Sequence, residues 1–157
     1  MDIYKTYMTL LKFVYYNFNL ISYNLNMKEK MTKSSFSWEI KKEIINNTTT
    51  KPEIIAFING LIFTNAIEDE IKYELRIKNQ YILEKILKRL DKIKVPYYRQ
   101  SNWKNMFYIY KNDFLIKEKI QYKDHLTSFF AGVFCGGGYI SSKTTTSYHL
   151  EISKLGQ

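Results

Sequence analysis

The chain has 157 residues and 45% of them are hydrophobic, so it is long enough for one domain with a real core. Its 24 Lys and Arg residues outnumber its 15 Asp and Glu residues, which favours an anionic partner such as nucleic acid or an acidic membrane surface. The single cysteine, Cys135, excludes an internal disulfide and a multi-cysteine metal site, fits a reducing cytoplasm, and is expected to be a small buried residue.

The opening stretch, Met1 to Asn26, is rich in Tyr, Phe and Leu but is interrupted by lysines and asparagines. It is too polar for the roughly 20 apolar residues of a membrane span, and it lacks a small-residue cleavage site. Because Met27 and Met31 follow closely, we expect residues 1–34 to be an extra leader from a misassigned start. An amphipathic surface helix is the alternative. No membrane partner is expected.

Two helices are predicted after this leader. Apolar residues recur at helical spacing from Phe36 to Ile45, and Asn46 and the threonines that follow end the pattern. Pro52 fits the first turn of a second helix, which continues to Ile62 and is apolar on most of its circumference. Such a helix is expected at the centre of the molecule.

A strand and an amphipathic helix are predicted next. Residues alternate without a fault over 71–78, which places Ile71, Tyr73, Leu75 and Ile77 on one face and charged residues on the other. Asn79 is positioned to cap a helix that runs to about residue 92. The apolar stripe of that helix comprises Ile82, Leu83, Ile86, Leu87 and Leu90.

The rest of the chain predicts a hairpin, a helix and a second hairpin. Residues 94–99 and 104–111 are rich in β-forming types and are separated by a polar turn. An apolar helix over 125–135 is expected to end at Gly136–Gly138, followed by paired strands at 139–142 and 147–152. The predicted order is ααβαββαββ, an α+β fold.

Two of these helices carry related motifs. Residues Phe130–Gly138 (FAGVFCGGG) resemble the LAGLIDADG motif, and Ile58–Ala66 (INGLIFTNA) is a weaker version of it. Small residues in that motif let two helices pack closely, and an acidic residue near its end holds a metal ion beside the scissile phosphate. The eighth motif positions are Asn65 and Gly137, and neither supplies a carboxylate for Mg²⁺. We therefore expect no enzyme activity, no catalytic residue, no metal and no cofactor.

This pattern resembles the WhiA family of bacterial regulators, and three further stretches agree with it: Ser35–Ile44 (SFSWEIKKEI), the helix from Lys51, and Tyr148–Ile152 (YHLEI) after the glycines. The resemblance implies a LAGLIDADG homing-endonuclease-like fold over 35–157, with the second repeat incomplete and the family's helix-turn-helix domain absent. It also implies a cytoplasmic, nucleoid-associated DNA-binding protein that acts in cell division, chromosome segregation or, in spore formers, sporulation.

The DNA contacts are expected on the basic face of the sheet. The segment from Ile71 to Lys123 holds the whole positive excess of the chain. Tyr97, Tyr108 and Trp103 are available there for stacking. The residues expected to line a saddle-shaped face and to meet phosphates are Lys72, Arg76, Lys78, Arg99, Lys104 and Lys111. The alternative is a merely solvated face.

Two other functions stay open at this point. A working endonuclease would need displaced carboxylates, for which Glu68, Asp69 and Glu70 are the candidates, although three adjacent acids more often decorate an exposed turn. A protein-interaction module would self-associate or pair with another chain through its motif helices or through an open sheet edge.

Overall fold

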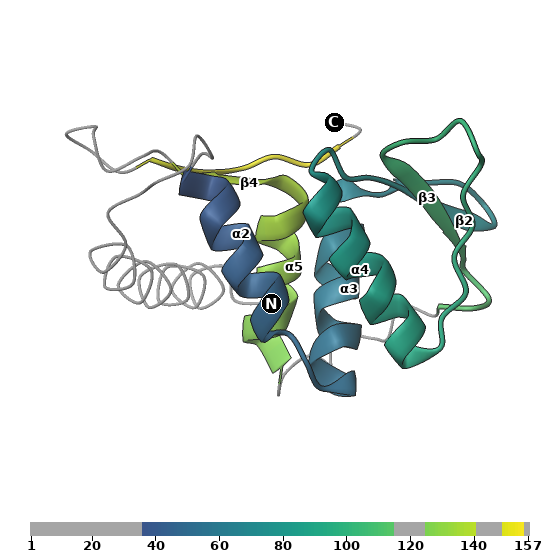
Figure 1. Cartoon of the computed structure of the whole chain (residues 1–157), viewed down its shortest axis with the longest axis horizontal. Helices are drawn as coiled ribbons and strands as arrows, with labels where there is room; N and C mark the ends of the chain where they lie inside the picture. The colour runs from purple at the N-terminus through teal and green to yellow at the C-terminus, as the bar shows by residue number, and fades with distance from the viewer. Residues whose placement is uncertain (1–35, 115–124, 141–148, 156–157) are drawn as a thin grey trace.

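Two central helices lie between two small sheets in the computed structural model of the chain, which describes residues 36–114, 125–140 and 149–155. Figure 1 shows α3 and α5 side by side, with β4 on one side and β2 and β3 on the other. The elements in chain order are α2 (Phe36–Asn47), α3 (Lys51–Asn65), β1 (Ile67–Glu68), β2 (Lys72–Arg76), α4 (Gln80–Ile93), β3 (Met106–Tyr110), α5 (Leu126–Gly137), β4 (Gly138–Ile140) and β5 (Leu150–Ile152). The α+β fold class is confirmed. The leader proposed for residues 1–34 lies outside the described residues.

The two motif helices pack on each other through glycine. A Cβ atom on Gly60 would overlap the backbone carbonyl of Phe129, and a Cβ atom on Gly132 would overlap that of Phe57. The same step along the sequence relates Gly60 to Gly132 and Phe57 to Phe129, so the contact repeats itself about a local two-fold axis. Only glycine allows the two backbones to approach this closely.

The first turns of α3 and α4 show the expected capping residues. Pro52 lies in the first turn of α3, and the carboxylate of Glu53 accepts a hydrogen bond from the N–H of Thr50 at 2.9 Å. The side chain of Asn79 accepts from the N–H of Ile82 at 3.1 Å, as predicted, and the whole predicted apolar stripe of α4 is buried.

Cys135 is buried as predicted, and burial raises the pKa of its thiol to about 12.

The larger sheet is antiparallel with the strand order β1–β2–β3. Tyr73 and Leu75 of β2 pair with Ile109 and Phe107 of β3, and these four side chains are buried in the same core as α4. Ile71, which the alternation placed on the same face, does not share their burial, since it is 61% exposed. Ile71 precedes the strand, in the turn where Asp69 binds its N–H.

The predicted hairpin between residues 94–99 and 104–111 is also wrong. The segment before the turn contributes only an isolated bridge between Tyr98 and Tyr108, and β3 pairs instead with β2. Lys94 adopts a left-handed conformation that ends α4, and Pro96 has no N–H to give to a strand ladder. Tertiary pairing with β2 therefore decides where the strand lies.

Two smaller expectations need correction. Helix α5 continues through Gly136 and Gly137, and only Gly138 begins the next strand, because the N–H of Gly138 still bonds to the carbonyl of Phe134. The short strand β1 was not predicted. The second hairpin is confirmed as β4 paired with β5. The predicted strand positions 141–142 and 147–148 lie outside the described residues. Among the helices described here, none is long and apolar enough to cross a membrane.

Candidate nucleic-acid interface

The end of the first motif helix is occupied by hydrogen bonds to backbone. The Oδ1 atom of Asn65 accepts from the N–H of Arg76 at 2.9 Å, and its Nδ2 atom donates to the carbonyls of Arg76 (3.0 Å) and Gly136 (3.1 Å). The residue is only 4% exposed. Asn65 thus joins α3 to β2 and to α5, and both polar atoms of its side-chain amide bind backbone groups.

The end of the second motif helix is closed in a related way. The carbonyl of Gly137 accepts from the N–H of Ser153 at 2.9 Å, directly after β5. A Cβ atom on Gly137 would overlap the carbonyl oxygen of Ser153. Any side chain at this position would have to displace the strand segment. Neither motif end therefore presents a carboxylate, and within the described ranges no three His, Cys, Asp or Glu residues gather to hold a metal ion.

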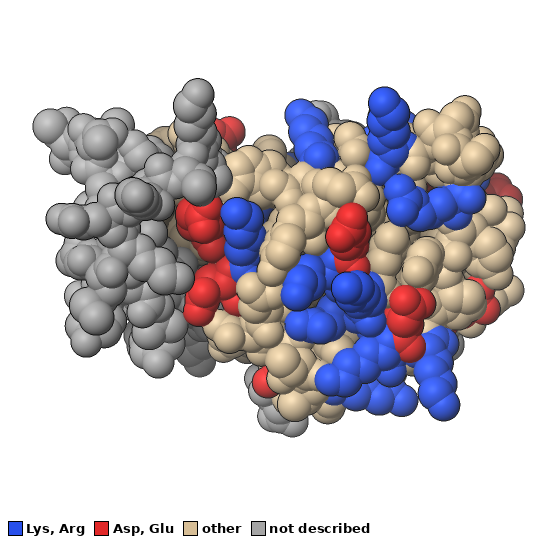
Figure 2. All heavy atoms as spheres, in the orientation of Figure 1, with Lys and Arg blue, Asp and Glu red and all other residues tan. Residues whose placement is uncertain are grey.

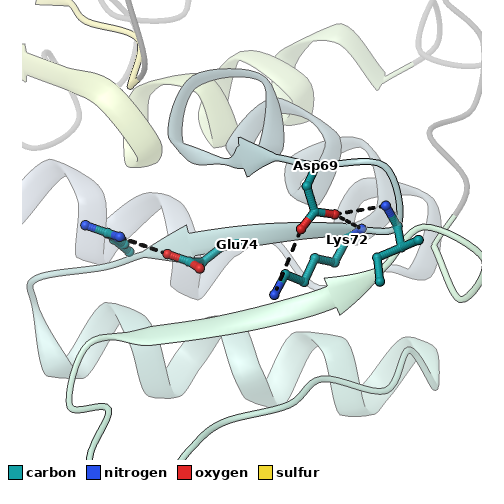
Figure 3. Close-up of polar contacts among 5 residues, drawn as sticks. Asp69, Lys72 and Glu74 are labelled. Carbon is teal, nitrogen blue, oxygen red and sulfur yellow. Dashed lines mark hydrogen bonds and ion pairs between the residues drawn. The ribbon is translucent and has the colours of Figure 1, made fainter.

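The acids after the first motif build a turn, as expected for exposed acids. Asp69 accepts from the N–H groups of Ile71 (2.9 Å) and Lys72 (2.8 Å), as Figure 3 shows, and these two hydrogen bonds lower the pKa of its carboxyl. Glu68 accepts from Lys111 at 2.6 Å. The turn residues Asp69 and Glu70 and the β1 residue Glu68 are all exposed.

The outer face of the larger sheet mixes charges of both signs. Lys72, Glu74 and Arg76 alternate with the buried residues of β2 and so point away from the core. The ammonium of Lys72 lies 3.9 Å from Asp69, and the guanidinium of Arg76 lies 2.9 Å from Glu74 (Figure 3). Two of the predicted DNA contacts are therefore partly neutralised by neighbouring carboxylates.

Three of the other four predicted contacts gather at one end of β2 and β3, and Lys111 lies at the opposite end. Lys78 is exposed beyond the end of β2, and Lys104 is exposed in the turn before β3. Arg99 donates to the carbonyls of Trp103 (3.2 Å) and Lys104 (3.0 Å), so it braces that turn. The ammonium of Lys111 lies 5.2 Å from the ring centroid of Tyr73, one of the two residues of β2 that face the core. DNA binding by these six residues stays a prediction.

Several cations of this segment lie on α4 instead. Figure 2 shows Lys and Arg side chains gathered along α4 and below its last turn. Its polar side carries Lys85, Lys88, Arg89 and Lys92. Because α4 and the sheet bury their apolar sides in one core, these cations and the outer sheet face point in different directions. A charge excess that is continuous in sequence is divided between two surfaces.

Aromatic side chains cover much of the outer sheet face. Tyr98 and Tyr108 are stacked with ring centroids 5.3 Å apart, and the edge of Tyr110 meets both rings at 5.0 and 5.4 Å. Trp103 lies 6.0 Å from Tyr108. The ammonium of Lys72 lies 5.0 Å from the centroid of the Tyr108 ring. We call Tyr98, Trp103, Tyr108 and Tyr110 the aromatic platform.

Of the three predicted stacking residues, Tyr108 and Trp103 lie on the outer sheet face and Tyr97 does not. The ring of Tyr97 meets the buried ring of Phe107 at 6.4 Å, and its hydroxyl lies 3.4 Å from Asp91. It therefore lies on the core side. Sequence reasoning missed Tyr98 because the register of its segment was unknown. A hairpin register that pairs Tyr98 with Tyr108 across the polar turn would have identified Tyr98 as a residue of the outer face.

Comparison with solved structures identifies the architecture. The N-terminal LAGLIDADG domain of DUF199/WhiA superposes with a TM-score of 0.60 at 22% identity, covering 78% of this chain and 68% of that one. Full-length DUF199/WhiA from Thermatoga maritima superposes with a TM-score of 0.57 at 21% identity, covering 76% of this chain. This chain has the fold of the WhiA LAGLIDADG domain.

The likeness to WhiA is one of fold. No protein-family description and no curated protein matches the sequence. The chain spans 44% of the length of full-length WhiA. The expectation of a WhiA-like LAGLIDADG architecture, made from the two motifs, is therefore confirmed. A shared fold does not by itself assign a function, which depends on the residues that the fold carries.

Proposed function

We propose that this domain binds DNA and does not cut it. The observation that carries the proposal is the state of the two motif ends, where Asn65 holds backbone groups and Gly137 leaves no room for a side chain. Metal-dependent phosphodiester cleavage needs charged oxygen ligands at the scissile phosphate. The small residues that pack the two helices remain, so the architecture persists without the groups that perform the chemistry.

The DNA contacts are proposed on the outer sheet face and its rim. Lys78 and Lys104 are exposed and form no ion pair among the described residues, so they are the cations best placed to meet phosphates. Lys72 and Arg76 contribute after exchanging their carboxylate partners, and Arg99 and Lys111 support the neighbouring turns. Such contacts position the domain on the backbone and carry little sequence discrimination.

The biological role proposed with this binding follows the resemblance to the WhiA family. It is regulation of cell division, chromosome segregation or, in spore formers, sporulation, by a protein associated with the nucleoid. The resemblance to WhiA supports this role, and the net charge of +9 is compatible with it. Chromatin-like co-localisation of a fluorescent fusion with DNA would support it, and a uniform distribution through the cell would contradict it.

The first experiment measures binding of the full chain to labelled DNA across a salt series, with magnesium present. We expect binding that weakens steeply with salt, by roughly 0.7 to 0.9 in log affinity per unit of log salt for each phosphate contact, and DNA that stays intact. Magnesium-dependent nicking would overturn the non-catalytic assignment. Absence of binding to any DNA at low salt would overturn DNA binding itself.

A second candidate function is assembly through an open sheet edge. In the part of the chain that the structure describes, β5 pairs only with β4, whereas β2 has a neighbour on each side. The motif helices, in contrast, already pack on each other within the chain. Sedimentation of the protein alone tests this candidate, because dimers that form without DNA and fail to retain it would favour an interaction module.

A further inference from the structure

The aromatic platform is not part of the hydrophobic core. Tyr108 and Tyr110 belong to β3, where they alternate with the fully buried Phe107 and Ile109, so their rings lie on the opposite side of the sheet. Tyr98 is 40% exposed, and the other three members are half-buried, largely against one another. Four aromatic rings gathered on the solvent side of a small sheet call for a binding explanation.

The charges around the platform do not favour a duplex. Glu74 and Asp69 pair with Arg76 and Lys72, so the centre of this face has little net charge. Exposed cations remain at one end of the strands, where Lys78 follows β2 and Lys104 precedes β3. A double helix presents a dense line of phosphates and keeps the flat faces of its bases inside the stack. This surface offers rings at its centre and exposed cations at one end.

We infer that the outer sheet face binds single-stranded DNA by stacking unpaired bases on the aromatic platform, in preference to duplex DNA. This inference rests on the proposed DNA binding and specifies its substrate. Every unpaired base has a π-face, so stacking on tyrosine and tryptophan tolerates any sequence, while basic residues at the rim follow the backbone. Tyr98, the most exposed member, is the first ring that an incoming base meets.

Tyr98 can be changed without disturbing the sheet. It is joined to β3 through backbone groups, since its N–H donates to the carbonyl of Tyr108 at 2.9 Å and its carbonyl accepts from the N–H of Tyr108 at 3.0 Å. Tyr98→Ala removes the ring and keeps this bridge. Tyr98→Phe keeps the ring. Tyr139→Ala is the matched control, because Tyr139 is also an exposed tyrosine on a strand, β4, in the other sheet.

The test compares the full-length variants by fluorescence anisotropy, using a mixed-sequence DNA strand of about 15 nucleotides and the duplex of the same sequence at one salt concentration. We expect the single strand to bind at least about tenfold more tightly. Tyr98→Ala should lose about tenfold in affinity for the strand, while Tyr98→Phe and Tyr139→Ala stay within about twofold of the parent protein.

A second measurement reports stacking directly. Trp38 and Trp103 are the two tryptophans of the chain, so Trp38→Phe leaves Trp103 as the one fluorophore of this type. The single strand should quench its emission, and the duplex should not. Equal or tighter binding of duplex, or unchanged strand affinity in Tyr98→Ala, overturns the preference for unpaired bases while leaving DNA binding intact. Failure of both DNAs to bind at low salt overturns the proposed function as well.

Discussion

Gly60 and Gly132 lie opposite each other where α3 and α5 meet, and each leaves room for a backbone carbonyl of the other helix. A methyl group at either position would overlap that carbonyl, from Phe129 in one case and from Phe57 in the other. Carbonyl groups within a helix cannot move away as a side chain can. The close approach of the two motif helices therefore depends on these two residues.

Gly132→Ala is expected to lower the free energy of unfolding by roughly 2–3 kcal/mol, because the helices must separate to admit the methyl group. This loss exceeds the gain of about 1 kcal/mol that alanine normally brings to a helix interior. Urea denaturation measures the difference. Gly136→Ala is the control with a smaller expected loss, since its methyl group would first meet the Thr64 hydroxyl, a side-chain atom. An unchanged stability in Gly132→Ala would contradict the packing described here.

Asn65→Asp is expected to lower the free energy of unfolding by about 3 kcal/mol. The new carboxylate would lose the amide donor and would face the carbonyls of Arg76 and Gly136 in a buried site. We also expect no magnesium-dependent nicking, because Gly137 supplies no second carboxylate. Asn102→Asp, at an exposed position, should leave the stability unchanged. Nicking that appears in Asn65→Asp alone would show that one carboxylate suffices.

The double variant Lys78→Gln with Lys104→Gln should reduce the slope of log affinity against log salt by about 1.5, as expected for two lost phosphate contacts. The control is Lys88→Gln with Lys94→Gln, which removes the same formal charge from the middle of α4 and from its C-terminal cap. Equal effects in the two double variants would indicate attraction by net charge. A larger effect in the control would move the DNA contact to α4.

Lys94→Gly is expected to stabilise the protein by about 1 kcal/mol. Lys94 ends α4 with φ at 60°, a left-handed conformation that costs a side-chain-bearing residue free energy and costs glycine almost none. Thermal or urea denaturation measures the gain. Lys88→Gly, in the exposed middle of the same helix, should instead cost about 1 kcal/mol. Destabilisation in both variants would contradict the left-handed cap.

Glu53→Gln should flatten the dependence of stability on pH in acid. Hydrogen bonds from Thr50 and Thr49 at the start of α3 lower the pKa of the Glu53 carboxyl. A carboxyl whose pKa is depressed on folding stabilises the protein above its unfolded pKa, about 4.3, and loses this contribution as the pH falls through the folded value. Since the site is largely open to solvent, we expect less than about 1 kcal/mol. Identical acid unfolding curves would contradict the capping role.

Local patterns predicted those features that depend on neighbouring residues. The alternation in β2, the apolar stripe of α4 and its Asn79 cap follow from the spacing of residues a few positions apart, and each is confirmed where the strand itself extends. The two motifs likewise predicted a pair of buried helices. The absence of carboxylates at Asn65 and Gly137 was also readable from the sequence, because it concerns residue identity alone.

Tertiary structure decided the features that depend on which distant segments meet. Pairing of β3 with β2, instead of with the segment before its turn, determined that Tyr98 joins Tyr108 on the outer face and that Tyr97 turns inward. The same packing divided the basic segment between α4 and the sheet, and placed the Asn65 amide against the backbone of Arg76. A shift of one position reverses the face on which every strand residue lies, and the residue types on both faces of the 94–111 segment are too similar to specify the register locally.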